Sequence, residues 1–380
     1  MNCCDRKLIK VLFMTMFSIT IQLAGQTVND CDDSPDLPYP TVVENSGARH
    51  VVDQKNDLGS FADDTADDMT HPQMMFSDTT RLGRPFAKDP HVIIFQGRYL
   101  MYYSIPGYLD SEGVEHGWGI GIAESYDLEK WKRIGEVNRD PEATYEAKGF
   151  AAPCALVVDG RVNLFYQTYG NGRNDAICHA WSIDGVHFLR NDTNPIFKPV
   201  GQWNAGRAID ADVIHINDRF LLYYATRDPE MKVQMLGVAV ATAPTDFRRE
   251  DWHDLALGKP ILRPELPWER DCIEAPSVVV KNGIFILFYA GGYNNAPQQI
   301  GVAQSTDGVR WTRLAEQPLL ANGQPGTWNS SESGHPHLFS HPDGEDYLFF
   351  QGNHDQGNTW FISKVKINYH NNRPTINQQD

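Results

Sequence analysis

Cysteine is scarce in this chain: six occur in 380 residues, and two of them, Cys3 and Cys4, stand at the extreme N-terminus. The remaining cysteines are Cys31, Cys154, Cys178 and Cys272. They are too few for a disulfide scaffold in so long a chain, and their spacing matches no zinc motif. We therefore expect mostly buried free thiols.

Basic residues are outnumbered, because 33 Lys and Arg face 49 Asp and Glu, and the formal net charge is -16. An acidic surface repels phosphate backbones and anionic headgroups, which disfavours nucleic acid and anionic lipid as partners. A local pocket of Arg or Lys can still bind an anionic substrate, since short-range pairing can outweigh the global field.

Long hydrophobic runs are missing outside the N-terminus, so we expect no membrane span. Lys7 and Lys10 precede one apolar run, Val11–Ala24, which is too short for a comfortable span and is followed by small residues. This pattern predicts a signal peptide over residues 1–25 and a secreted or periplasmic protein. Residues 26–78 are acidic and rich in Asp, Ser, Thr and Pro, which predicts a flexible N-terminal arm.

Helical periodicity is also missing, and from Phe86 onward short β-rich runs alternate with Gly, Asn and Asp turns. One pattern of four such runs recurs from positions 89, 152, 210, 275 and 335, and its last copy looks truncated. A period of roughly 60 residues is the size of a propeller blade. We predict an all-β, five-bladed β-propeller with four-stranded antiparallel blades over residues 79–370, followed by a tail at 371–380. A β-sandwich is the alternative, but it does not explain five equal periods.

The repeat also identifies residues whose role should be packing. An aromatic residue recurs at one outer-strand position, which predicts contacts between blades. These residues are Trp131, Phe188, Trp252 and Trp311.

The starts of the inner strands carry the candidate catalytic residues. Inner strands of a propeller converge on the axis, so their first residues should meet at one mouth of the channel. Unpaired charge is costly to bury there, so a packing role does not account for three acids. In the repeat register these positions hold Asp89, Ala152, Asp210, Ala275 and His335, and Glu274 directly precedes the fourth. We therefore predict Asp89, Asp210 and Glu274 as the catalytic set.

Three short motifs resemble those of glycoside hydrolase family 43 and its clan: Lys88-Asp89-Pro90, Ile209-Asp210-Ala211 and Glu274-Ala275-Pro276. The resemblance covers residues 85–366 and implies a five-bladed propeller that cleaves glycosidic bonds with inversion. It implies Asp89 as general base, Asp210 as the residue that tunes and orients the acid, and Glu274 as general acid. Family 117, which acts on agar oligosaccharides, is similar in architecture. Ile273 stands where that family has His, and Ala211 and Ala275 stand where family 43 commonly has Pro and Gly.

Loops on the same face should supply substrate contacts, because aromatic rings can stack on sugars and polar groups can bind hydroxyls. Packing of the loops is the alternative for any single Trp. Arg207 and Arg270 either bind a substrate carboxylate or sulfate or pair with the catalytic acids. The candidates are Arg84, Trp118, Trp203, Arg207, Trp268, Arg270, His335 and His354, and we favour Trp203 and Trp268 because each shortly precedes an acid motif.

We expect no required cofactor. The resemblance implies that His335 faces a metal or water cluster at the axis, so Ca²⁺ or another divalent ion is the expected alternative there. His335 and His337 share one face of a strand, which also allows a metal site, and a hydrogen-bonding core histidine is the competing interpretation.

These features predict an inverting, exo-acting glycoside hydrolase that releases sugar from plant or algal oligosaccharides. Two alternatives stay open: a phosphorylase-type propeller, which needs a phosphate site beside the acids, and a non-catalytic carbohydrate-binding propeller. The expected partner is an oligosaccharide or polysaccharide, and the oligomeric state is left open.

Overall fold

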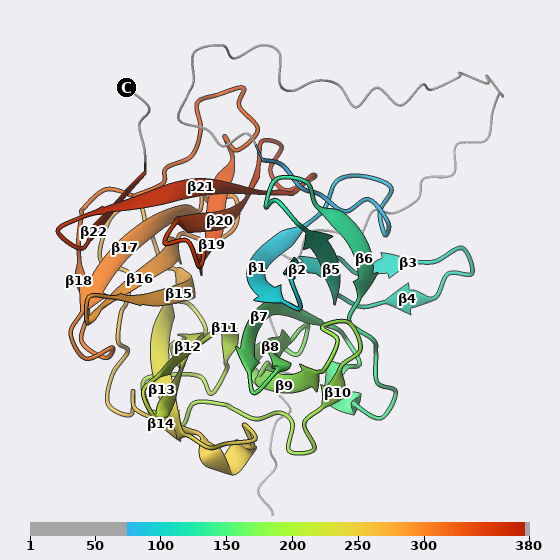
Figure 1. The fold of residues 1–380 in the computed structure, drawn as a ribbon, viewed down its shortest axis with the longest axis horizontal. Coiled ribbons are helices and arrows are strands. Elements are labelled where there is room, and N and C mark those ends of the chain that lie inside the picture. The colour runs from blue at the N-terminus through green and yellow to red at the C-terminus, as the bar shows by residue number, and fades with distance from the viewer. Residues whose placement is uncertain (1–73, 377–380) are drawn as a thin grey trace, which may run out of the picture. The chain divides into compact units, whose positions relative to one another are not determined.

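The protein is a five-bladed β-propeller in a computed structural model that describes residues 74–376. The predicted signal peptide (1–25) and residues 26–73 of the predicted arm lie outside the described residues. In Figure 1 the five sheets follow one another around a ring in chain order, so the last blade lies beside the first. Inner strands of neighbouring blades contact one another around the axis. The fold predicted from the repeat is confirmed.

Each blade is a four-stranded antiparallel sheet whose strand order follows the chain. Blade one contains β1 (Lys88–Phe95), β2 (Arg98–Ile105), β5 (Gly119–Ser125) and β6 (Lys132–Glu136), and blade two contains β7 (Phe150–Val158), β8 (Arg161–Thr168), β9 (Ile177–Ser182) and β10 (Leu189–Arg190). Blade three contains β11 (Ile209–Ile216), β12 (Arg219–Arg227), β13 (Gln234–Thr242) and β14 (His253–Asp254), and blade four contains β15 (Ile273–Lys281), β16 (Ile284–Gly291), β17 (Gln299–Ser305) and β18 (Thr312–Arg313). Blade five contains β19 (Glu332–Ser340), β20 (Asp346–Asn353), β21 (Phe361–His370) and β22 (Arg373–Ile376).

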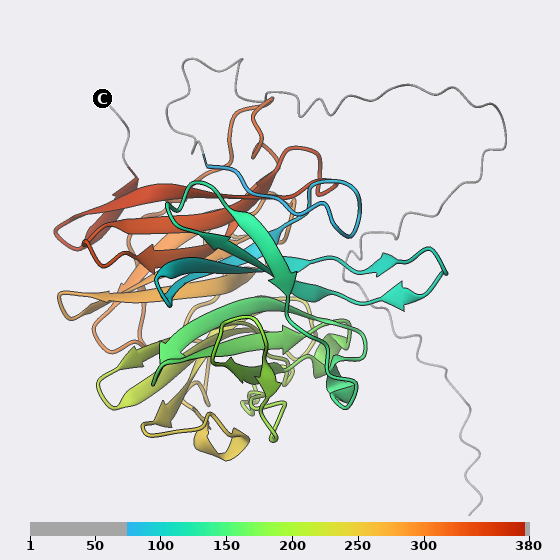
Figure 2. The same cartoon turned by 45° about the vertical axis from the view of Figure 1, so that its right-hand side comes forward.

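The remaining elements lie in the loops. A small hairpin of β3 (Tyr108–Leu109) and β4 (Glu115–His116) extends from blade one between β2 and β5, as Figure 2 shows. Three short 3₁₀ helices complete the described chain: η1 (Thr144–Glu146), η2 (Gly172–Asn174) and η3 (Arg249–Asp251). None of the helices within residues 74–376 has the length and apolar character needed to cross a membrane.

Aromatic side chains join each of blades one to four to the blade before it. The outer-strand aromatic of one blade packs on a second-strand ring of the preceding blade, in an edge-to-face arrangement that suits the ring quadrupoles. The packing role predicted for these residues is thereby confirmed. The contacts are Trp131–Phe349 at 6.2 Å, Phe188–Tyr102 at 5.8 Å, Trp252–Phe165 at 6.3 Å and Trp311–Tyr223 at 6.0 Å between ring centroids.

The segment before β1 closes the ring. Phe76 exchanges two backbone hydrogen bonds of 2.8 Å with Ile362 of β21, and Met74, Phe76 and Asp78 are buried. Asp78 also accepts a hydrogen bond of 2.8 Å from the Tyr103 hydroxyl. The boundary of the flexible arm at residue 78 is therefore wrong, because residues 74–78 pack against the first and last blades.

The fifth blade is complete. Its fourth strand, β22, pairs with β21 from Ile367–Ile376 to His370–Arg373. The propeller therefore extends past residue 370, and the expectation of a truncated last copy with a tail from 371 is wrong. This strand has the sequence Arg-Pro-Thr-Ile and lacks the aromatic residue that marks the outer strand of the other copies.

The closing segment yields a prediction about stability. Replacing Phe76 with Ala should lower the free energy of unfolding by about 3 kcal/mol, because a buried ring that packs on Tyr103 is lost and leaves a cavity. Urea denaturation measures the effect. Tyr126→Ala, at a position whose side chain is 73 % exposed, is the matched control. Equal losses in both variants would show that residues 74–78 do not hold the ring closed.

Candidate active site

The five positions predicted as equivalent share one unusual backbone conformation. Their φ angles lie in the left-handed region, at 52° for Asp89, 48° for Ala152, 50° for Asp210, 49° for Ala275 and 45° for His335. Each residue lies where the pairing of the inner strand with the second strand shifts register. This conformation costs a non-glycine residue roughly 1–2 kcal/mol, so the surrounding structure must hold it in place.

Side chains of the preceding blade hold four of these bulges. The backbone N–H of Asp89 donates to Gln351 Oε1 at 2.9 Å, and that of Asp210 donates to Gln167 Oε1 at 2.7 Å. In the same way, the N–H of Ala152 donates to Ser104 Oγ at 2.8 Å and the N–H of His335 donates to Gln298 Oε1 at 3.1 Å. Blade-to-blade contacts therefore position the residues that sequence analysis placed at the mouth.

The structure brings the three predicted acids together. Asp89, Asp210 and Glu274 are 8 %, 7 % and 9 % exposed. Burial raises the pKa of Asp210 well above its usual value, and the negative charges of Glu274 and Asp89 raise it further. The nearby positive charge of Arg207 and the backbone N–H of Ala275 only partly offset this rise. The Asp210 carboxyl is therefore harder to ionise than an exposed aspartate.

Two glutamine amides bind Glu274. Gln298 Nε2 donates to Glu274 Oε1 at 2.6 Å, and Gln234 Nε2 donates to Oε2. The Gln234 oxygen accepts hydrogen bonds from Arg207 at 3.3 Å and Arg227 at 3.1 Å, which fixes the orientation of the amide. The two amides thereby fix the position of the Glu274 carboxyl.

His335 orients Asp89. Its Nδ1 lies 3.1 Å from Asp89 Oδ1, and burial lowers the pKa of the imidazole, so a neutral ring donates from Nδ1. The Asp89 carboxylate is thus held from one side, with its other oxygen left for water or substrate. The expectation of a cation at His335 stays a prediction.

A fourth carboxylate, Glu332, was missed by sequence reasoning. It is fully buried at the start of β19, and burial raises its pKa to about 8 despite the positive charge of Lys88. It accepts hydrogen bonds from Gln351 Nε2 at 2.8 Å and from the Asn295 N–H at 2.6 Å. Gln351 therefore links Glu332 to the backbone of Asp89. The aligned part of the fifth copy begins at His335. The repeat could have revealed Glu332 only if the alignment had begun three residues earlier, at the start of β19.

Arg207 is the predicted substrate residue whose charge acts on the acids. Its side chain is 11 % exposed, lies 3.6 Å from Asp175, and has a buried Nε without a hydrogen-bond partner. Arg270 and His354, by contrast, are exposed. Arg207 thus pairs with Asp175 rather than directly with a catalytic acid, and a role in binding an anion stays a prediction.

The predicted aromatic residues are anchored by protein contacts. The Trp203 indole N–H donates to the Ala256 carbonyl, and that of Trp268 donates to the Glu316 carbonyl at 3.0 Å. Trp268 also stacks on Tyr289 with 6.0 Å between ring centroids. These contacts describe packing roles, and a contact of either ring with substrate stays a prediction.

Trp118 and Arg84 lie near the junction of the first and last blades. The Trp118 ring contacts Phe86 at 5.7 Å and Tyr169 at 4.9 Å between centroids. The Arg84 guanidinium donates to the Asn358 carbonyl and stands 5.9 Å from the Phe86 ring centroid. Trp118 is only partly buried, so part of this aromatic group is open to solvent.

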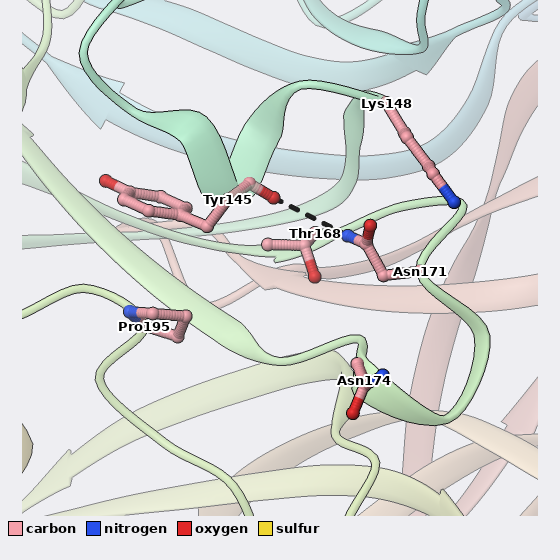
Figure 3. A pocket seen from close by; sticks show the side chains of 6 residues that line it. All are labelled: Tyr145, Lys148, Thr168, Asn171, Asn174 and Pro195. Atoms are coloured by element: carbon pink, nitrogen blue, oxygen red, sulfur yellow. Dashed lines mark hydrogen bonds between the residues drawn. The ribbon is translucent and has the colours of Figure 1, made fainter.

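A cavity of about 320 Å³ opens among the loops of blade two, as Figure 3 shows. Thr168 ends β8, so the cavity is on the same face as the start of the inner strands. Thr168 Oγ1 lies 3.2 Å from Asp175, which in turn pairs with Arg207. Polar and apolar surface both line the cavity, and five of its six lining side chains carry a group that can bind a hydroxyl: Tyr145, Lys148, Thr168, Asn171 and Asn174, with Pro195 as the sixth.

The model of the family described as glycosyl hydrolases family 43 matches residues 82–373. The chain belongs to this family. The matched region contains strands of all five blades and ends at residue 373, where β22 begins. Membership identifies a carbohydrate-active protein with a glycosidase fold, and it implies a carbohydrate substrate.

Other known proteins are similar to this family 43 chain. A 1,2-beta-oligomannan phosphorylase from Thermoanaerobacter sp. (strain X514) is 29 % identical over 227 residues, which cover 57 % of this chain and 67 % of that protein. A thermostable family-43 glycoside hydrolase superposes with a TM-score of 0.60 at 19 % identity, over 76 % of this chain and 92 % of its own. An endo-1,4-beta-xylanase from Bacteroides thetaiotaomicron gives a TM-score of 0.57 at 23 % identity, over 77 % and 94 %. The two structural likenesses concern the fold.

The buried carboxyl of Glu332 yields a prediction for this family 43 protein. Its pKa is raised from 4.5 to about 8 in the folded state, so folding binds a proton between these values. Glu332 therefore makes stability fall as pH rises from about 4.5 to 8. Glu332→Gln should flatten this slope, measured as urea unfolding free energies at pH 5 and pH 8.5. Glu142→Gln, at an exposed position, is the control, and an unchanged slope in Glu332→Gln would contradict the prediction.

Proposed function

We propose that this protein is an inverting, exo-acting glycoside hydrolase acting on plant or algal oligosaccharides. The observation that carries the proposal is the group of buried acids at the mouth of the propeller, where burial and the neighbouring acids raise the pKa of Asp210. Inversion needs one carboxylate to activate water and one carboxylic acid to protonate the leaving oxygen. The raised pKa of Asp210 favours retention of a proton among these acids.

Asp89 is the proposed general base. The hydrogen bond from His335 Nδ1 fixes one carboxylate oxygen, and the left-handed backbone held by Gln351 fixes the position of the residue. The Asp89 carboxylate removes a proton from water while the water oxygen bonds to the anomeric carbon. The bond from that carbon to the leaving oxygen breaks in the same step, with inversion.

Glu274 and Asp210 supply the proton for the leaving oxygen. Glu274 is the proposed donor to the glycosidic oxygen, and Asp210 holds the proton from which Glu274 is loaded. Two neighbouring carboxyls in a buried site resist joint ionisation, which keeps one proton on the pair at neutral pH. After the step, Asp89 carries the proton taken from water, and exchange with solvent restores both groups.

Action at a chain end is supported by the loops around the mouth. The β3–β4 hairpin follows β2, so it arises on the face where the inner strands begin, and the cavity beside Thr168 lies on that face too. A small cavity on the same face as the acids suits a terminal sugar unit better than the middle of a polymer. The non-catalytic alternative is weaker, because simple binding does not require a proton held between buried acids.

Phosphorolysis is the second candidate, and Arg207 favours it. Its largely buried guanidinium lies 3.6 Å from Asp175, donates to Gln234 Oε1, and lies close enough to lower the pKa of Asp210. A phosphate beside this cation would replace water as the nucleophile. The similarity to an oligomannan phosphorylase supports testing this reading.

Substitution of the acids tests the hydrolase proposal. Glu274→Gln should lower kcat on natural oligosaccharides by about 10²–10⁴-fold, and less on aryl glycosides whose leaving group needs no proton. Asp89→Asn should lower both rates alike, because water activation is lost for every substrate. Asp218→Asn, whose side chain is 74 % exposed in the β11–β12 turn at the opposite end, is the control. NMR of the first product should show the inverted anomer, and full activity in both acid variants would overturn the proposal.

Phosphate dependence separates the two candidate reactions. We expect initial rates on an oligosaccharide panel to change less than about twofold when phosphate is added, because water is the proposed nucleophile. Mass spectrometry of the products checks this directly. A rate that requires phosphate and yields a sugar 1-phosphate, and that falls in Arg207→Gln but not in Arg219→Gln at the exposed β11–β12 turn, would establish the phosphorylase instead.

A further inference from the structure

A second ring of polar residues lies one step deeper along the axis than the catalytic acids. It consists of the residues two positions after the left-handed residue in each inner strand. All are buried, at 0–7 % exposure, and none belongs to the acid set described above. The ring is His91, Cys154, Asp212, Ser277 and His337.

Each member of this ring contacts the backbone of the next inner strand. His91 Nε2 donates to the Ala155 carbonyl at 2.9 Å, and His337 Nε2 donates to the Val92 carbonyl at 3.1 Å. The other three side chains accept from backbone N–H groups. Cys154 Sγ accepts from Val213 at 3.2 Å, Asp212 Oδ2 from Val278 at 2.8 Å, and Ser277 Oγ from Leu338 at 2.9 Å. The five contacts form a closed circle that joins every blade to the next.

One polar atom per side chain is enough to form the hydrogen bond that joins two blades. Ser277 forms this bond with its single hydroxyl group. Histidine and aspartate bring a second donor atom that this role leaves unused. A neutral imidazole whose Nε2 carries the proton has an unprotonated Nδ1, and His337 Nδ1 is buried without a hydrogen-bond partner. Asp212 keeps Oδ1, and it takes part in none of the ion pairs found within residues 74–376.

Three of the ring's side chains converge. One donor atom each of His91, Cys154 and Asp212 lies within 4.8 Å of the others, and the His91 and His337 rings are 3.7 Å apart between centroids. Ligands of a tetrahedral zinc ion stand about 3.5 Å apart, given bond lengths of about 2.0–2.3 Å. The ion would therefore have to draw the donors together by roughly 1 Å.

We propose that His91, Cys154 and Asp212, with His337 as the fourth donor, bind a divalent transition metal of the zinc type at the propeller axis. Thiolate and imidazole ligands select such a metal over Ca²⁺ or Mg²⁺, which prefer oxygen ligands. The bonds from both Nε2 atoms to backbone carbonyls are those that fix the tautomer of a metal-bound histidine. A cation also compensates the buried Asp212 carboxylate.

Such an ion would stabilise the fold at the point where all five blades meet. It would lie below the acids and bind to the folded chain only, because its ligands come from three or four different blades. Binding to the folded state alone raises the apparent stability. The residual exposure of 6–7 % at His91, Asp212 and His337 leaves a route for the ion from solvent.

Cobalt is the probe that tests the site, because a Co²⁺–thiolate bond gives a charge-transfer band in the near ultraviolet. Full-length protein without a histidine tag is treated with chelator, dialysed and titrated with Co²⁺, and in parallel with Zn²⁺. We expect saturation at one ion per chain, displacement of Co²⁺ by Zn²⁺, and a rise in Tm of a few degrees.

Variants decide whether the band comes from this ring. Cys154→Ala should abolish the band, whereas Cys178→Ala should keep it, because Cys178 is an equally buried free cysteine outside the ring. If Cys154→Ala does not fold, His91→Gln and Asp212→Asn should each weaken binding at least tenfold. Absence of stoichiometric binding, or a band that persists in Cys154→Ala, would overturn the proposal. Glycosidase activity is not the readout, so this result is independent of the proposed hydrolysis.

Discussion

Hydrogen bonds between neighbouring blades are the constraint on which this structure depends. At one level they hold a left-handed residue at the start of four strands, and one level deeper they join all five strands in a circle. A left-handed non-glycine residue is unfavourable by itself, so the conformation persists only because the adjacent blade supplies an acceptor. The geometry of the mouth is consequently a property of the assembled ring.

The electrostatics of the mouth follow from this arrangement. Glutamine side chains bind the backbone and the acids at the same time: Gln298 contacts His335 and Glu274, and Gln351 contacts Asp89 and Glu332. Neutral amides satisfy hydrogen bonds without cancelling charge. Several carboxyls therefore share a buried region with little cationic compensation, and the protein responds by keeping protons on some of them.

Closure of the ring fixes the position of the first blade, which carries Asp89, relative to the last blade, which carries His335. The last blade meets the first through the bridge of Phe76 to Ile362 and through the backbone contact of Ala87 with Trp360. The ammonium group of Lys88, the residue before Asp89, lies 4.4 Å from the ring centroid of Trp360. The segment that closes the propeller thus leads directly into the motif that contains Asp89, so ring closure and placement of Asp89 are coupled.

The sequence by itself determined the fold and the three acids, because a repeat places its equivalent residues at equivalent points around an axis. Asp89, Asp210 and His335 could be aligned for this reason, and their shared φ angles bear the alignment out. Residues that depart from the repeat could not be predicted in this way. β22 lacks the aromatic residue that marks the other outer strands, and Glu332 precedes the aligned part of the fifth copy. Only the tertiary structure decided that the pKa of Asp210 is raised and that Trp203 and Trp268 are anchored by protein contacts, because burial and neighbouring side chains set both.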